Sequence, residues 1–85
     1  MVKFVNNGAD IIKSLKERVE AGDNIGIERI AHMLKGAAGN LGLDDIAKEA
    51  ESIELAARTG EKIDYFGEID KLYRLIRIIE EEMNR

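Results

Sequence analysis

The stretch IERIAHMLKGAAGNLGL, residues Ile27 to Leu43, decides the fold. Its apolar residues recur every three or four positions, which predicts an amphipathic helix whose buried face packs against other helices. We expect that face to contain Ile27, Ile30, Ala31, Leu34, Ala38 and Leu41. The stretch also carries the single histidine of the chain, His32, and two glycines, Gly36 and Gly39, at positions where alanine would favour a helix more.

The sequence on either side of this stretch predicts three further helices. We expect them over about residues 8–21, from Asp44 or Asp45 to Thr59, and from just after Asp64 to about residue 83. Asp23 or Asn24 is expected to cap the quoted helix, and Asp44 or Asp45 to cap the next one. The links are short and no segment alternates apolar and polar residues as a strand does. The prediction is therefore an all-α fold, an up-down-up-down antiparallel four-helix bundle, with a single domain over residues 1–85.

Each flanking helix has its own apolar face, and Phe4 and Val5 are expected to staple the start of the first one. The expected core residues of these three helices are Ile11, Ile12, Leu15, Val19, Ile46, Ala50, Ile53, Ala57, Phe66, Ile69, Leu72, Tyr73, Ile76, Ile79 and Met83.

The composition excludes several classes of protein. The 85 residues are 45% hydrophobic and 35% charged, with no proline and no cysteine. Without cysteine, the chain has neither a disulfide framework nor a thiolate metal site. The formal net charge of −4 argues against a nucleic-acid binder that needs a basic face. No apolar run is long enough for a signal peptide or a membrane span, so we expect a soluble domain. The absence of cysteine fits the cytoplasm, and we expect a monomer.

A helical wheel places His32 on the outer face of its helix. At about 100° per residue, His32 falls about 160° from Leu34, the centre of the buried face, and Gly36, Gly39 and Leu43 fall at about 140° to 200°. We therefore expect His32 to be exposed. Each glycine inside a helix costs about 1 kcal/mol relative to alanine. We interpret Gly36, Gly39 and Leu43 as a surface on which another protein docks, with room left by the missing side chains.

Two cations flank His32, with Arg29 one turn before it and Lys35 one turn after it. An exposed neutral imidazole is a good nucleophile, and its attack on a phosphoryl group yields phosphohistidine. Arg29 and Lys35 would stabilise the added negative charge. Hydrolysis is not expected, because we predict no second acid, base or metal ligand beside the ring, and Glu28, four residues earlier, completes no triad. No glycine-rich loop for ATP is present, so the phosphoryl group is expected from a partner.

The run Ala31-His32-Met33-Leu34-Lys35-Gly36, followed by Leu41-Gly42, resembles the signature of histidine-containing phosphotransfer (HPt) domains. The similarity continues through Ala50, Ile53-Glu54 and Arg58-Thr59-Gly60, so it covers roughly residues 25–60. The sequence departs from the commonest form at Met33, where Thr or Ser often follows the histidine, and at Ala37, where Ser is frequent. These departures are expected to affect the rate of phosphotransfer and the choice of partner more than the ability of His32 to accept a phosphoryl group.

This resemblance implies a role in a multistep two-component phosphorelay. His32 would accept a phosphoryl group, most often on Nε2, from the aspartyl phosphate of a response-regulator receiver domain and pass it to another receiver. Lys35 would help to hold the phosphate, and Gly36 would give the receiver room. The domain would be a phosphocarrier rather than an enzyme and would need no cofactor, with Mg²⁺ expected on the receiver. A hybrid histidine kinase is a further candidate partner.

Other interpretations remain open. The phosphoacceptor domain of chemotaxis-type histidine kinases carries a similar histidine-lysine-glycine run. The dimerisation domain of ordinary histidine kinases resembles this chain less, because its motif places a proline soon after the histidine. A plain helical adaptor would bind a partner through the His32 face without being phosphorylated. A small metal-binding bundle is the weakest alternative, since one histidine is a poor ligand set.

Overall fold

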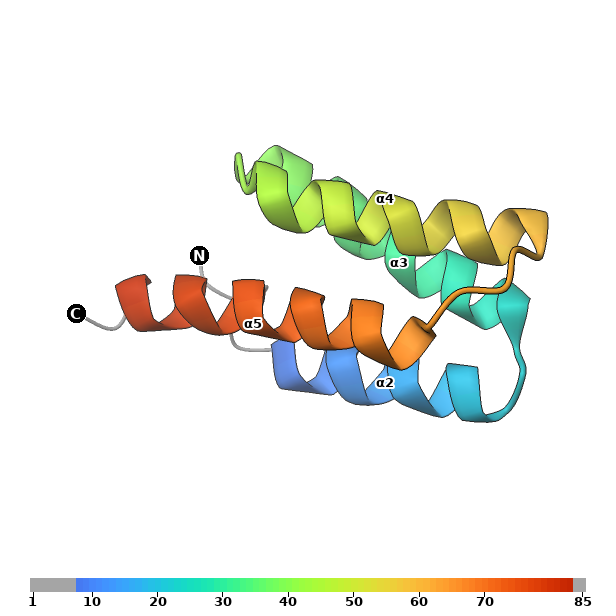
Figure 1. Cartoon of the computed structure of the whole chain (residues 1–85). Helices are drawn as coiled ribbons and strands as arrows, with labels where there is room; N and C mark the ends of the chain where they lie inside the picture. Colours follow the sequence, from blue (N-terminus) through green and yellow to red (C-terminus); the bar gives the residue numbers. More distant parts are fainter. Residues whose placement is uncertain (1–7, 84–85) are drawn as a thin grey trace.

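The computed structural model describes residues 8–83, which form four helices: α2 (Gly8–Glu20), α3 (Asn24–Asn40), α4 (Asp44–Thr59) and α5 (Tyr65–Met83). Successive helices run in opposite directions and form an elongated bundle of 39 × 20 × 18 Å (Figure 1). The predicted all-α four-helix bundle is confirmed. None of the helices within residues 8–83 is long and apolar enough to cross a membrane.

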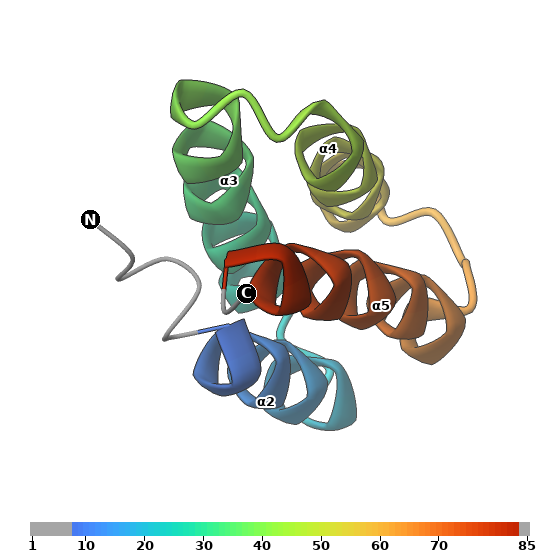
Figure 2. The ribbon, with the colours of Figure 1, turned by 90° about the vertical axis from the view of Figure 1, so that its left-hand side faces the viewer.

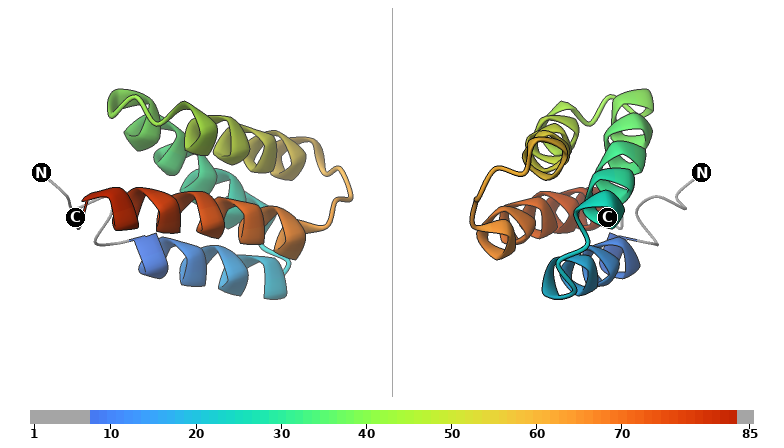
Figure 3. Two further views of the ribbon diagram at one scale, coloured as in Figure 1. Left: turned by 60° about the vertical axis from the view of Figure 1, so that its left-hand side comes forward. Right: turned by 90° about the vertical axis from the view of Figure 1, so that its right-hand side faces the viewer.

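The helices are arranged in a ring, in the order in which they occur along the chain. α2 packs against α3 and α5, and α4 packs against α3 and α5, with the most extensive packing between α3 and α4 (Figure 2). Views from two further sides show the same order (Figure 3). The face of α4 that enters the core is rich in alanine, which lets α3 come close. This close approach positions the polar groups of the functional site described below.

The core consists of aliphatic residues from all four helices, as the helical periodicity predicts. The buried members are Ile12, Leu15, Ile27, Ala31, Leu34, Ala38, Ile46, Ala50, Ile53, Ala57, Ile69, Leu72 and Ile76. Ile11, Val19, Ile30, Tyr73 and Ile79 are partly buried against them. Phe4 and Val5 and the side chain of Met83 lie outside the described residues.

Two residues that were expected in the core are exposed. Leu41 is 52% exposed. α3 ends at Asn40, so the helical period no longer places Leu41 on the buried face. Phe66 is 46% exposed. The side chain of Tyr65, the first residue of α5, is partly buried against the core at this end of the bundle instead.

The helix ends are defined by aspartate caps and glycine turns. The Asp23 side chain accepts a hydrogen bond from the backbone N–H of Gly26 at 2.9 Å, which confirms one predicted cap. The expected cap of α4 is wrong. That helix has Leu43 at its N-cap, without a side-chain hydrogen bond. Asp44 and Asp45 lie inside the first turn, where their negative charges interact favourably with the positive end of the helix dipole.

Three glycines allow the chain to leave the helices. Gly22, Gly42 and Gly60 follow α2, α3 and α4 with φ values of 68°, 73° and 74°. Only glycine adopts this left-handed conformation without a steric cost.

Candidate functional site

His32 lies in the middle of α3 and faces solvent, as predicted. Its side chain is 68% exposed. Gly36 and Gly39 lie on the same side of α3, and a Cβ atom added at either glycine would meet no atom of residues 8–83 within 4 Å beyond its own stretch of helix. The ring therefore stands on a stretch of helix surface that other molecules can approach closely.

One edge of the imidazole is held by a buried carboxylate from α4. His32 Nδ1 lies 2.8 Å from Glu54 Oε2, and Glu54 is only 1% exposed. Because an ionised carboxylate only accepts hydrogen bonds, Nδ1 carries the proton. In the neutral ring the lone pair is then on Nε2, the nitrogen that does not contact Glu54. The expectation that no second acid lies beside His32 is wrong.

Glu54 is also paired with two cations. Lys35 Nζ lies 2.9 Å from Glu54 Oε1, and Arg58 Nη2 donates a hydrogen bond to Glu54 Oε2 at 2.6 Å. Arg58 Nε in turn donates to Glu28 Oε2 on α3 at 2.8 Å. We call these five residues, Glu28, His32, Lys35, Glu54 and Arg58, the charge network. It joins α3 to α4 and surrounds the single buried charge of the site.

The network keeps Glu54 ionised although the residue is buried. Burial by itself raises the pKa of the Glu54 carboxyl, but contacts with Lys35 and His32 outweigh burial, and the net pKa is lowered from its ordinary value. The pKa of Arg58 is raised, chiefly by its hydrogen bond to Glu28. A buried carboxylate of this kind is stable only when its partners remain in place.

The two predicted phosphate-stabilising cations occupy different places. Lys35 contacts Glu54, on the α4 side of His32. Arg29 is exposed and lines a hollow of about 490 Å³ together with Ile25, Glu28, His32, Glu54 and Arg58. Arg29 and Arg58 therefore line the same hollow as His32.

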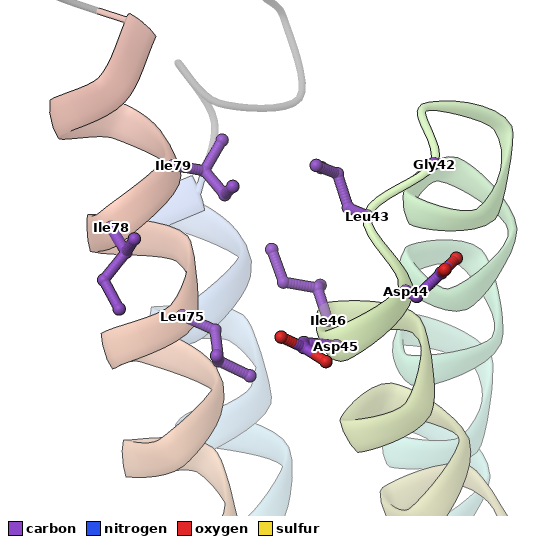
Figure 4. A pocket seen from close by; sticks show the side chains of 8 residues that line it. All are labelled: Gly42, Leu43, Asp44, Asp45, Ile46, Leu75, Ile78 and Ile79. Atoms are coloured by element: carbon purple, nitrogen blue, oxygen red, sulfur yellow. The ribbon is translucent and has the colours of Figure 1, made fainter.

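Leu43 does not lie on the His32 face of α3. It is in the turn between α3 and α4, partly buried against the core. There it lines a groove that Asp44 and Asp45 of α4 and apolar side chains of α5 also line (Figure 4). The wheel position was wrong because the helix ends before Leu43. This placement gives no support to a role for Leu43 in docking beside His32.

Glu54 and Arg58 are the residues that the sequence reasoning assigned no role. A weak signal was present, because a helical wheel of α4 places Glu54 only about 70° from the centre of the apolar face. A carboxylate at the edge of a buried face requires a partner. The partner itself could not be identified, since His32 and Glu54 are 22 residues apart in sequence.

Within residues 8–83, no three metal-ligating side chains cluster together.

Comparison with known protein families and structures identifies one related family. The sequence model of one protein family, described as "Hpt domain", matches residues 1–84. Searches of curated proteins and of solved structures gave no significant match.

Proposed function

We propose that His32 is the phosphoacceptor of this chain, which belongs to the Hpt domain family. Members of this family are phosphocarriers that work with receiver domains. The observation that carries this proposal is the pairing of the exposed imidazole with a buried carboxylate. In this proposal His32 receives the phosphoryl group from a receiver aspartate and passes it to another receiver in a multistep relay.

The geometry supports attack through Nε2. The Nε2 lone pair forms a bond to phosphorus while the bond from phosphorus to the aspartyl oxygen breaks, and the receiver carboxylate leaves. The ring becomes cationic because Nδ1 keeps its proton, and the negative charge of Glu54, 2.8 Å away, stabilises that cation. No proton has to move, and the reverse transfer to a second receiver follows the same path.

The cations around the ring would stabilise the added phosphate. Lys35 and Arg29 lie one turn on either side of His32 along α3. We expect both side chains to contact oxygens of a phosphoryl group on Nε2. Mg²⁺ is expected on the receiver, beside its aspartate.

The docking surface in this proposal is the exposed side of α3. Gly36 and Gly39 leave space around the ring. Two apolar side chains, Ile25 and Met33, are 66% and 56% exposed along the same helix. Exposed apolar groups next to a reactive centre are a common feature of protein-binding surfaces.

Mixing the purified domain with a panel of phosphorylated receiver domains tests the proposal. Intact mass would detect the transferred phosphoryl group, and lability in acid would assign it to histidine. We expect an acid-labile adduct with at least one receiver, and none in the His32→Gln variant. His32→Gln should retain the helical content of the wild type in circular dichroism.

Other outcomes point to the alternatives. Phosphorylation only by a histidine kinase with ATP, and by no receiver, would indicate the phosphoacceptor domain of a chemotaxis-type kinase. Receiver binding without any adduct would indicate an adaptor. An adduct that persists in His32→Gln would refute His32 as the acceptor.

A further inference from the structure

Glu28 belongs to the charge network but is connected to the His32 ring only through two other residues, Arg58 and Glu54. It lies on α3 one turn before His32 and accepts a hydrogen bond from Arg58 Nε at 2.8 Å. Arg58 and Glu54 lie one turn apart on α4. The contacts therefore run from Glu28 to Arg58, from Arg58 to Glu54, and from Glu54 back to His32. Both ends of this path are on α3 and both middle residues are on α4.

The guanidinium of Arg58 needs a second partner to stay on Glu54. Its side chain is 51% exposed, and exposed ion pairs exchange readily with water. The guanidinium is planar and presents its N–H groups in a fixed fork. When Glu28 binds the Nε edge, the orientation of the whole plane is restricted, and Nη2 is directed at Glu54 Oε2.

Glu54 Oε2 is the atom on which the ring orientation depends. It accepts from Arg58 Nη2 at 2.6 Å and contacts His32 Nδ1 at 2.8 Å. A carboxylate whose oxygen is held by a second donor has less freedom to rotate away from the ring. Loss of Arg58 from Glu54 would therefore weaken the constraint that keeps the proton on Nδ1 and the lone pair on Nε2.

We propose that Glu28 is a positioning residue for phosphotransfer, which acts through Arg58 and Glu54 to hold His32 with Nε2 free. This inference rests on the proposed phosphoacceptor role of His32. Glu28 itself touches neither the phosphoryl group nor the ring in this scheme. Its effect reaches the ring only through the guanidinium of Arg58.

The tautomer of His32 tests the inference without any phosphotransfer. The ¹⁵N chemical shifts of the imidazole report the ratio of the Nδ1–H form to the Nε2–H form in the neutral ring. In Glu28→Ala we expect this ratio to fall by about twofold to fivefold, the range that corresponds to the loss of an exposed ion pair. Glu28→Gln retains an oxygen that accepts from Arg58 and should restore part of the ratio. Glu17→Ala, which removes an exposed carboxylate on α2, should leave it unchanged.

A double-mutant cycle separates the relay from a direct effect of the Glu28 charge on the ring. If Glu28 acts through Arg58, Glu28→Ala causes no further change once Arg58→Ala is present. An equal shift in both backgrounds would show direct electrostatics and overturn the inference. An unchanged tautomer ratio in Glu28→Ala, in a protein with wild-type helicity, would also overturn it.

Transfer kinetics provide a second readout. The initial rate of phosphorylation by a phosphorylated receiver should fall about twofold to fivefold in Glu28→Ala, with the affinity for that receiver unchanged. If no receiver phosphorylates even the wild type, the proposed function fails, and the tautomer ratio still decides whether Glu28 positions the ring. If the wild type is phosphorylated and Glu28→Ala matches it in both rate and tautomer, only the inference about Glu28 fails.

Discussion

At the scale of single residues, the site depends on one buried charge. Glu54 is the only charged residue among the buried side chains of residues 8–83. Burial alone would neutralise such a carboxyl group. Its pKa is instead lowered, because contacts with Lys35 and His32 outweigh the cost of burial. The same carboxylate contacts His32 and Lys35 of α3 and Arg58 of α4, so a change at this one side chain tests both the stability of the bundle and the proposed phosphotransfer.

Glu54→Gln should therefore reduce both properties. The amide can still accept from His32 Nδ1, but it loses the negative charge that Lys35 and Arg58 contact. Because these partners are partly exposed, we expect a loss of only about 1–3 kcal/mol in the free energy of unfolding. The rate of phosphotransfer should also fall, since a neutral amide stabilises the cationic ring less. Urea unfolding and receiver-dependent phosphorylation measure the two effects.

The sign of the pH dependence gives a check on this assignment. The pKa of Glu54 is lowered in the fold, so its contribution to stability is present above its ordinary value of 4.5 and is lost as the pH falls through the lower folded value. The stability gap between wild type and Glu54→Gln should close over that acidic range. A gap that stays constant there would contradict the assignment. Glu51→Gln, at an exposed position of α4, serves as the control.

At the scale of elements, α3 contains two glycines that lower its helix stability and leave its surface open. Gly36 and Gly39 are inside the helix, where alanine is favoured by about 1 kcal/mol. Packing within the described part of the chain requires neither glycine, since an added Cβ would meet no atom there within 4 Å beyond its own stretch of helix. By contrast, Gly26 and Gly67 lie where a Cβ would collide with the capping carboxylates of Asp23 and Asp64. Packing within the described residues therefore does not account for the glycines near His32, which is consistent with the docking surface that we propose.

Gly36→Ala should consequently separate stability from function. We expect the free energy of unfolding to rise by up to about 1 kcal/mol, because alanine restricts the unfolded chain and fits the helix without a clash. Receiver affinity and phosphotransfer rate should both decrease, since the new methyl group lies one turn from His32. The measurements are thermal or urea unfolding and titration with a receiver. A stabilised variant with undiminished binding would show that the glycine has no part in docking.

At the scale of the whole molecule, a second acidic contact joins α4 to α5. Burial and the neighbouring Glu68 raise the pKa of Glu49 to about 7. The neighbouring Glu49 in turn lowers the pKa of Glu68, and Lys71 Nζ lies 3.4 Å from Glu68 Oε2. These opposite shifts favour a protonated Glu49 beside an ionised Glu68 near neutral pH.

This contact predicts that the bundle loses stability as the pH rises towards and beyond neutrality. The folded pKa of Glu49 lies above its ordinary value of 4.5, so its contribution is full below 4.5 and is lost as the pH rises through about 7. The loss should be on the order of 1–2 kcal/mol, since one pKa unit corresponds to about 1.4 kcal/mol and Glu68 offsets part of the effect. Urea unfolding at several pH values across this window measures it.

Glu49→Gln should flatten that dependence. Its amide N–H can donate to Glu68 at every pH, and no proton is lost. The exposed Glu51→Gln should retain the wild-type dependence. Equal slopes in wild type and Glu49→Gln would assign the pH effect to other groups.

The amino-acid sequence was enough to predict the four helices, most of the core and the outward position of His32. These features depend on local spacing, because a period of 3.6 residues assigns each side chain to a face of its own helix. The Asp23 cap and the glycine turns after three of the helices also depend only on residues nearby in the sequence. The run around His32 also sufficed for the family resemblance, which the match over residues 1–84 confirmed.

The contacts between side chains of different helices became known only from the folded structure. Glu54 contacts His32 across 22 residues, and Glu28 contacts Arg58 across 30. The pairing of helices, their rotation and their distance determine such contacts, and a single helix contains none of this information. The positions of Leu41 and Leu43 also differ from the prediction, because α3 ends at Asn40 and its helical period does not extend to them. Local periodicity places His32 on the surface, but the carboxylate beside its ring comes from the packing of a second helix against α3.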